Sequence, residues 1–314
     1  MSQTTDGVTS RIGVHDERVG YVLVFLSAFI WSFGGAIARF IEVDDSWTIV
    51  FWRSAWAAAF LIGFMLWRDG LRGMLALFRG MGGAGIAVAV CFATASTCFI
   101  VALAYTTVAN VVLIQAGVPL IAALIAWLVF REQISLATWG AIAAVIFGVA
   151  IMVSGSFGGE VSPIGDGLAV LIAFAFATAT VITRRFSAVR MTPATCLGTA
   201  IAAAFAATQA GSLAVSTVDM GLLFTFGALN LGLGLALFTI GARLIPAAFA
   251  ALIGTAETVF APIWVALIHS EIPSTRTVVG GAVVLAALLT HIALEFRRQA
   301  RPAKPGVTGF PSPH

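Results

Sequence analysis

Two ionisable side chains interrupt long apolar runs of this 314-residue sequence, namely Arg53 and Glu257. A charged group deep in a lipid bilayer costs several kcal/mol unless it is paired or faces water, so each is a functional candidate. Glu257 could accept a proton or pair with a solute ammonium group, and it could equally stabilise the fold by hydrogen bonding to a neighbouring helix. For Arg53 we favour a structural role, with the side chain snorkelling to the interface or pairing with Glu42, Asp44 or Asp45.

Uncharged polar and aromatic side chains inside the apolar runs form a second group of candidates. They could line a cavity for a solute, although polar residues at this depth often only join helices, for about half a kcal/mol each. The group comprises Trp31, Ser32, Thr94, Thr97, Asn110, Gln115, Thr178, Asn230 and Trp264. The two tryptophans could stack on an aromatic solute or serve as packing bulk.

Motifs for metal binding and catalysis are absent from the sequence. It contains no His-Glu-x-x-His, no glycine-rich phosphate loop after a strand, and no Cys/His spacing of a metal site. The three cysteines lie inside apolar runs and cannot form a fully paired disulfide framework. We therefore expect no metal, no cofactor and no enzyme activity, and keep an intramembrane enzyme as an alternative.

The composition excludes a soluble globular protein. Hydrophobic residues make up 60% of the chain and charged residues 10%, and the mean hydropathy is +1.03. Soluble domains carry about 25% charged residues. At about 20 apolar residues per crossing, the chain has room for about ten to twelve spans and no extramembrane catalytic domain. The net charge of +3 arises from basic residues in short loops, so we expect a lipid bilayer as partner and no nucleic acid.

Apolar runs between charged or turn-rich segments predict an all-α polytopic membrane protein with ten transmembrane helices. The predicted helices cover residues 20–40, 46–67, 82–105, 107–129, 135–153, 164–186, 192–215, 219–241, 247–269 and 275–296. With ten crossings, most of the 17 Lys and Arg residues fall on one side, which the positive-inside rule makes cytoplasmic. Residues 1–19 and 297–314 are therefore predicted as cytoplasmic tails, the second disordered, with the connection around residues 68–79 as the longest loop.

Two weak internal similarities divide the chain into two repeats of five helices each. Residues 26–39 resemble residues 171–184, and residues 109–135 resemble residues 248–274. The predicted repeats cover residues 20–155 and 156–296. Because five is odd, the second copy must enter the membrane from the opposite side. Such inverted repeats around a central cavity are typical of secondary transporters that work by alternating access.

Glycine and proline residues mark candidate hinges for this movement. Gly117 and Pro119 in the fourth predicted helix and Gly254 in the ninth occupy nearby positions of the two repeats. A proline at position 119 removes a backbone hydrogen bond and should kink its helix.

Two segments carry a resemblance to a known family. Residues 250–262 contain a mid-helix Glu257 and Pro262 and are followed by His269-Ser-Glu271, while residues 110–119 are followed by Phe130-Arg-Glu132. With these segments, the chain resembles the drug/metabolite transporter superfamily, in its ten-helix class built from two EamA-type repeats. It departs from the pattern at Val118, where the family has Glu, and at Thr258, where it has Pro. The chain is also similar in general character to the YddG-type exporters of aromatic and other amino acids.

The resemblance implies a bacterial inner-membrane transporter that exports small organic solutes, most of all amino acids. A mostly uncharged cavity with aromatic side chains suits a zwitterion with an apolar side chain. Phosphorylated solutes would call for several buried Lys or Arg residues. A drug or other metabolite carrier of the same superfamily, a channel and an intramembrane enzyme stay as alternatives, and Glu257 is the candidate for proton coupling.

Overall fold

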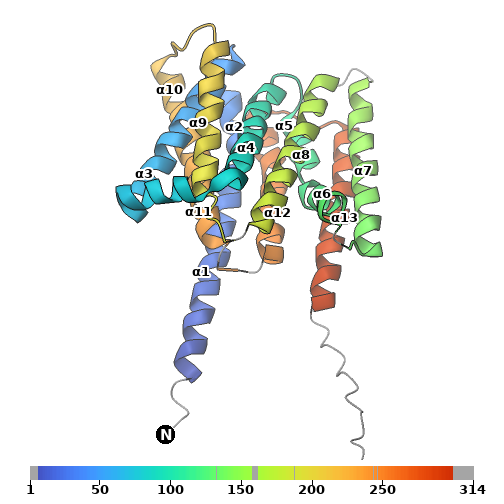
Figure 1. Cartoon of the computed structure of the whole chain (residues 1–314). Coiled ribbons are helices and arrows are strands. Elements are labelled where there is room, and N and C mark those ends of the chain that lie inside the picture. Colours follow the sequence, from blue (N-terminus) through green and yellow to red (C-terminus); the bar gives the residue numbers. More distant parts are fainter. Residues whose placement is uncertain are drawn as a thin grey trace, which may run out of the picture.

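A computed structural model describes residues 6–131, 133–157, 162–186, 188–242, 244–245 and 247–299, and within these ranges every regular element is a helix. The elements are α1 (Asp6–Ser32), α2 (Gly34–Phe40), α3 (Ser46–Gly80), α4 (Gly82–Leu103), α5 (Val108–Gln115), α6 (Val118–Phe130), α7 (Leu136–Phe157), α8 (Pro163–Arg185), α9 (Thr192–Gln209), α10 (Thr217–Phe224), the π-helix η1 (Thr225–Leu233), α11 (Gly234–Gly241), α12 (Ala247–His269) and α13 (Thr275–Gln299). They form one bundle in which α1 begins and α13 ends at the same end (Figure 1).

Helix length and apolar composition indicate fewer membrane crossings than the sequence pattern does. Seven helical stretches are long and apolar enough to cross a membrane, and α5 and α6, bent by 42° to each other, make an eighth. Every predicted helix range overlaps one or more observed helices, but α9 and α12 do not pass this test. The ten crossings, the repeat boundaries and the inverted relation of the halves therefore stay predictions.

The predicted loop around residues 68–79 is wrong, because α3 continues through it. The chain turns at Gly70, whose φ of 67° lies in the left-handed region that glycine adopts without steric cost. The last turns of α3 then run across the bundle (Figure 1). Asp69 beside this corner forms a salt bridge of 2.9 Å with Arg190, just before α9. The predicted first tail, residues 1–19, is helical from Asp6 onward, where α1 begins.

Asp45 fixes the start of α3. Burial tends to raise the pKa of Asp45, but hydrogen bonds from Trp47 N, Thr48 Oγ1 and Gly211 N outweigh it and lower this pKa below its ordinary value. Thr48 Oγ1 also donates to Ser212 O at 2.6 Å. These bonds hold the first turn of α3 against the segment between α9 and α10.

Two of the predicted transmembrane helices are interrupted in the structure, and a third changes its winding. The first is divided at Phe33 into α1 and α2, and the fourth is divided at Ala116 and Gly117 into α5 and α6. Pro119 lies in the first turn of α6, where a missing N–H leaves no helix bond unmade, so the chain bends before the proline. The eighth is continuous but winds as a π-helix over η1, between α10 and α11.

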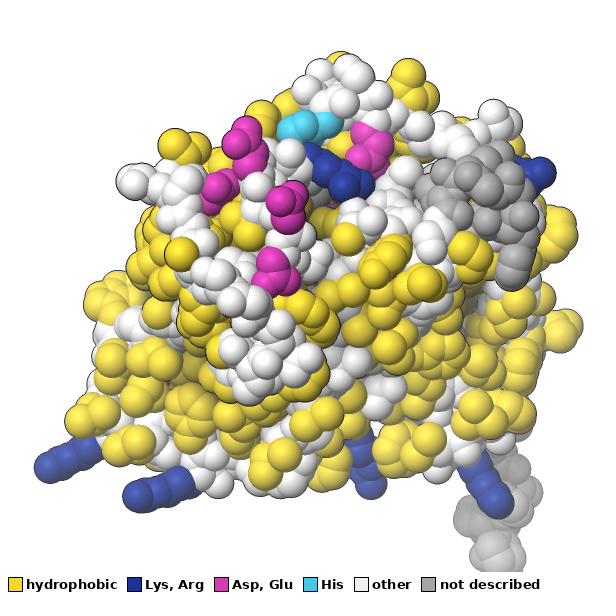
Figure 2. Space-filling view, turned by 90° about the horizontal axis from the view of Figure 1, so that it is seen from above, with side chains coloured by type: hydrophobic (Ala, Val, Ile, Leu, Met, Phe, Trp, Pro, Cys, Tyr) yellow, Lys and Arg dark blue, Asp and Glu magenta, His cyan; other side chains and the backbone are white. Residues whose placement is uncertain are grey.

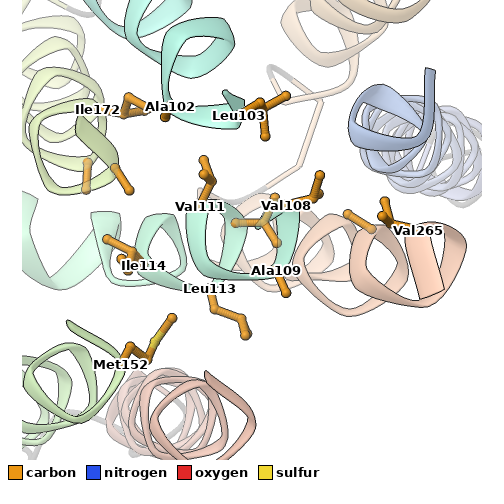
Figure 3. Packing of buried hydrophobic residues seen from close by; sticks show 14 of the residues in the cluster. Ala102, Leu103, Val108, Ala109, Val111, Leu113, Ile114, Met152, Ile172 and Val265 are labelled. Atoms are coloured by element: carbon orange, nitrogen blue, oxygen red, sulfur yellow. The ribbon is translucent and has the colours of Figure 1, made fainter. Parts of the chain in front are cut away.

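The short helix α5 lies in the middle of the bundle, and all its residues from Val108 to Ile114 are buried. Figure 3 shows side chains of α4, α7, α8 and α12 turned toward it, among them Ile172, Met152 and Val265. Protein thus encloses α5 on every side. The polar residues at the two ends of α5 are thus brought close to elements of both halves.

Glycines allow a close contact between α7 and α13. A Cβ atom on Gly280 would lie 2.5 Å from the carbonyl oxygen of Gly148, and one on Gly148 would lie 2.7 Å from the carbonyl oxygen of Gly280. Small residues at such a crossing let two membrane helices approach backbone to backbone.

Candidate functional site

The break between α1 and α2 gathers three of the predicted site residues. Ser32 Oγ donates to Phe29 O at 2.6 Å, and Asn230 Nδ2 from η1 donates to Ile30 O. Trp264 Nε1 from α12 donates to Ser32 Oγ at 3.0 Å. The last carbonyls of a helix lack partners within that helix. Side chains from two distant elements therefore bind where the first predicted span is interrupted.

An aromatic cluster lies beside this break. Trp264 stacks on Phe33 with ring centroids 4.9 Å apart and on Phe260 at 6.1 Å, and it meets Phe29 edge to face at 6.1 Å. Trp31, by contrast, packs against Phe238 at 5.5 Å, and its buried Nε1 has no hydrogen-bond partner in the described structure. The rings between α1 and α12 form a surface on which an apolar group could stack.

Arg53 lies inside α3, with 6% of its surface exposed. Its Cζ atom lies 4.5 Å from the ring centroid of Phe226 and 5.4 Å from that of Phe99, and Nη1 donates to Ser96 Oγ at 3.0 Å. Aromatic faces attract a guanidinium group, most strongly where water is excluded. The expected snorkelling or pairing with the acids at 42–45 is therefore wrong, because two rings and a hydroxyl hold Arg53 in the interior.

Glu257 lies on the side of α12 that carries the buried residues Ala261 and Val265, at a spacing of four residues. It is half-buried, and no described residue donates a hydrogen bond to its carboxylate. The glutamate therefore lies on a face of α12 that packs inside the bundle.

One aromatic ring connects Arg53 to the break in the first span. A Cβ atom on Gly34 would lie 3.5 Å from the ring of Phe226, which covers Arg53, and 3.1 Å from Asn230 Oδ1. Glu257 precedes Phe260 by about one turn of α12. Of the residues that the sequence singled out, the structure brings Ser32, Asn230 and Trp264 together, whereas the partners of Arg53 lie on other helices and gave no signal in the sequence.

Asn110 belongs to a second polar cluster, at the first turn of α5. Its Nδ2 donates to Asp166 Oδ1 at 2.8 Å, and its Oδ1 accepts from Thr277 Oγ1 at 2.6 Å. Thr106 Oγ1 also donates to Asp166 Oδ1, at 3.1 Å. Asp166 is fully buried. Nothing in the spacing of these residues along the sequence indicated that they would meet.

Thr94 and Thr97 lie on a face of α4 that turns away from Arg53. Ile86 and Val90, each 52% exposed, occupy the same face. At about 100° per residue, Thr94 lies about 160° and Thr97 about 100° around the helix from Ser96. The structure therefore does not bring these threonines to the break.

The remaining predicted residues make local contacts. Gln115 Nε2 donates to Val111 O at 3.3 Å, and Thr178 Oγ1 donates to Phe174 O at 2.8 Å, each within its own helix. Gly117 faces Val145 closely, and Gly254 borders open space. The two hinge candidates of the first predicted repeat, Gly117 and Pro119, lie at the bend between α5 and α6.

A charged cluster closes the end of the bundle at which α2 ends and α5 begins. Arg39 Nε donates to Glu271 Oε2 at 2.9 Å, and its two Nη atoms donate to Leu103 O and Thr106 O at 2.9 and 3.2 Å. Glu271 Oε1 also accepts from Val108 N at 2.8 Å. Figure 2 shows acidic side chains gathered on this end around a basic side chain. The cluster joins α2 and the ends of α4 and α12 to the start of α5.

We expect Arg39→Gln to destabilise the protein by about 2 kcal/mol, because it removes hydrogen bonds to a carboxylate and to two carbonyls. Thermal unfolding in detergent measures the loss. Arg276→Gln is the matched control, since Arg276 is on the same end and donates a single bond, to Ser154 O. Equal melting temperatures for the two variants would contradict a bracing role for Arg39.

Long apolar helices that enclose charged and polar groups define a polytopic membrane protein with the features of a solute carrier. The sequence matches the model of the EamA-like transporter family twice, over residues 18–154 and 163–292. The chain therefore belongs to the EamA-like transporter family, within the drug/metabolite transporter superfamily, and holds two copies of its domain. Members of this family are transporters of small solutes rather than enzymes.

The comparison with solved structures supports this fold. Sixteen chains match, among them a crystal structure with 16% sequence identity and a TM-score of 0.62, with 90% of this chain and 99% of that chain covered. At this identity the likeness shows the fold alone. No curated protein matches the chain.

Proposed function

We propose that this protein is a secondary transporter that moves small amphipathic organic solutes, foremost amino acids including aromatic ones, by alternating access. The break in the first span carries the proposal, because Ser32, Asn230 and Trp264 converge there from three elements. Discontinuous helices near the middle of the bilayer form the substrate sites of many secondary transporters.

The chemistry around the break favours amino acids over other organic solutes. Aromatic rings of α1 and α12 offer a stacking surface, and the two ionisable side chains that interrupt the apolar runs are one cation and one anion, Arg53 and Glu257. A solute with several negative charges would meet too few cations here. The general similarity to YddG-type exporters supports the same substrate class and an outward direction of transport.

The two family repeats support the alternating-access mechanism. We infer that the second repeat is inverted, that both termini are cytoplasmic in a bacterial inner membrane, and that the halves rock about Gly117, Pro119 and Gly254. The bend of 42° between α5 and α6 supports the first of these hinges. A proton gradient is the candidate driving force. In this mechanism Glu257 accepts a proton in one of the two conformations of the transporter and releases it in the other.

A panel of radiolabelled solutes in proteoliposomes tests the substrate class. We expect saturable counterflow with aromatic and branched-chain amino acids. Absence of counterflow with every amino acid would remove the substrate proposal, and counterflow with drugs or other metabolites alone would favour the alternative carrier. Ion conductance without saturable exchange would indicate a channel.

Variants connect this transport to the break. Asn230→Leu and Trp264→Leu should lower the counterflow rate by about tenfold or more, as each removes a hydrogen bond at the break and misplaces neighbouring groups. Thr208→Val is the matched control, because Thr208 Oγ1 binds only within its own exposed turn, to Phe205 O at 2.7 Å. Rates equal to that of the control would contradict a site at the break.

A further inference from the structure

We propose that the last turns of α3, residues 71–80, bind anionic phospholipids at the edge of the bilayer, with Arg72 and Arg79 on the phosphate groups and Leu71 and Leu75 among the acyl chains. Three features of α3 carry this inference: its length, the faces of its last turns, and the charges that these turns leave unpaired. The lipid surface goes beyond the proposed transport and is independent of which solute moves.

The part of α3 before Gly70 is long enough to cross the bilayer by itself. Residues 46–69 extend over about 36 Å at about 1.5 Å per residue, whereas the hydrocarbon core is about 30 Å thick. At Gly70, with its φ of 67°, the chain turns, and Figure 1 shows the remaining turns running across the long helices rather than along them. Residues 71–80 therefore follow a completed crossing and lie at the level of the lipid headgroups.

The last turns of α3 have one apolar face against the bundle and a second apolar face that is exposed. Met74 and Phe78 pack against buried residues of the bundle. Leu71 and Leu75, which are one turn apart, are 62% and 44% exposed. A helix that lies in the plane of the interface inserts such side chains among the acyl chains. The exposed leucines are therefore the part of this surface that contacts lipid tails.

The two arginines of these turns lie on one side of the helix. At about 100° per residue, Arg72 and Arg79 are about 20° apart around the helix axis, next to Leu71 and Leu75 and on the far side of them from the packed face. A long side chain in this position can extend its charged end to the headgroups while its stem stays on apolar surface. Lipid tails and lipid phosphates would thus meet adjacent strips of one helix.

These arginines lack a charge partner in the described part of the chain. Both are exposed, and neither forms a hydrogen bond or salt bridge with a described residue. Residues 70–80 contain no acid, and the neighbouring Asp69 accepts hydrogen bonds of 2.9 and 3.4 Å from Arg190. A guanidinium group binds phosphate through paired N–H donors, and each basic residue near the surface favours lipids with a net negative charge. The unpaired charges therefore select anionic over zwitterionic phospholipids.

Two lipids with the same acyl chains test the surface. Phosphatidylglycerol carries a net negative charge, and phosphatidylcholine carries none. We expect the full-length protein in detergent, titrated with each lipid and followed by native mass spectrometry, to bind phosphatidylglycerol at least tenfold more tightly. The variant Arg72→Gln/Arg79→Gln should keep a preference of threefold or less. Equal affinities of the wild-type protein for the two lipids would overturn the proposal.

A matched variant separates this surface from the charge of the whole protein. Arg18→Gln/Arg131→Gln removes the same two charges from exposed positions outside α3. It should keep the tenfold preference. If both double variants lose the preference alike, or if both keep it, residues 71–80 are not the binding surface.

Two further measurements show what these turns recognise. Leu71→Ser/Leu75→Ser keeps both arginines and should weaken the binding of both lipids at least threefold, because the acyl chains lose their apolar contacts. Inorganic phosphate, at the concentration of the lipid, should not displace phosphatidylglycerol. Displacement by phosphate, or unchanged lipid binding by the serine variant, would show a site for free anions and would overturn the lipid surface. Melting temperatures equal to that of the wild type in phosphatidylcholine check that each variant is folded, which is expected because all four residues are exposed.

Discussion

Replacing Gly280 by valine is expected to destabilise the protein by about 3 kcal/mol or more, because the added side chain forces α13 away from α7. A Cβ atom at this position would lie 2.5 Å from Gly148 O and 2.5 Å from Met152 Cγ. A backbone oxygen cannot turn aside as a flexible side chain can. The helices must therefore separate and lose part of the packing that joins them. Unfolding of the purified protein in detergent, followed by circular dichroism, measures the effect.

Gly140→Val is the control for this substitution. Gly140 lies on the same helix as Gly148, but a Cβ atom there would meet nothing within 4 Å. The same change of residue type should therefore leave the stability unchanged or raise it slightly, because valine has a higher helix propensity than glycine. A similar loss of stability for both variants would show that the contact between α7 and α13 is not the cause.

Replacing Asp166 by alanine is expected to cost about 3 kcal/mol, since each hydrogen bond to a charged group contributes about 1.5 to 3 kcal/mol. The carboxylate accepts from Asn110 Nδ2 and Thr106 Oγ1, and its removal leaves these buried donors unsatisfied. Asn110 also binds Thr277. The loss should therefore loosen α5, α8 and α13 together, which hydrogen exchange of their outer ends would detect.

Two further variants check this explanation. Asp166→Asn keeps an acceptor oxygen and should lose less stability than Asp166→Ala. Asp44→Ala removes an exposed acid that makes no described contact, and it should leave the melting temperature unchanged. Equal stability of Asp166→Ala and Asp44→Ala would contradict a stabilising role for the buried cluster.

The positions of the helices could be predicted because hydropathy is summed over many residues. Pro119 also indicated an interruption, since its chemistry is local. The break at Phe33 could not be predicted in the same way. The residues that bind there, Asn230 and Trp264, are distant from it in the sequence. The sequence did not predict the turn at Gly70, because the residues on both sides of it are helical.

The site was predictable only where a residue was unusual for its depth. Glu257 stood out as an acid within an apolar run, and Asn230 as an amide. Arg53 also stood out, but its burial depends on Phe99 and Phe226. Phenylalanine is common in membrane helices, so the positions of these two residues in the sequence did not indicate that they contact Arg53. Asp166 gave no such signal in the sequence, and only the packing of α5 against α8 shows it to be buried.

The π-helix η1 carries Asn230, which donates to Ile30 O at the break in the first span. In a π-helix each N–H bonds to the carbonyl five residues back instead of four, so each turn holds more residues than a turn of an α-helix. If η1 rewound as an α-helix, every N–H would keep a partner while α11 turned about its axis relative to α10. The same rewinding would draw Asn230 away from Ile30 O. A movement at the end of α1 would then be converted into a rotation of α11, with little loss of backbone hydrogen bonds.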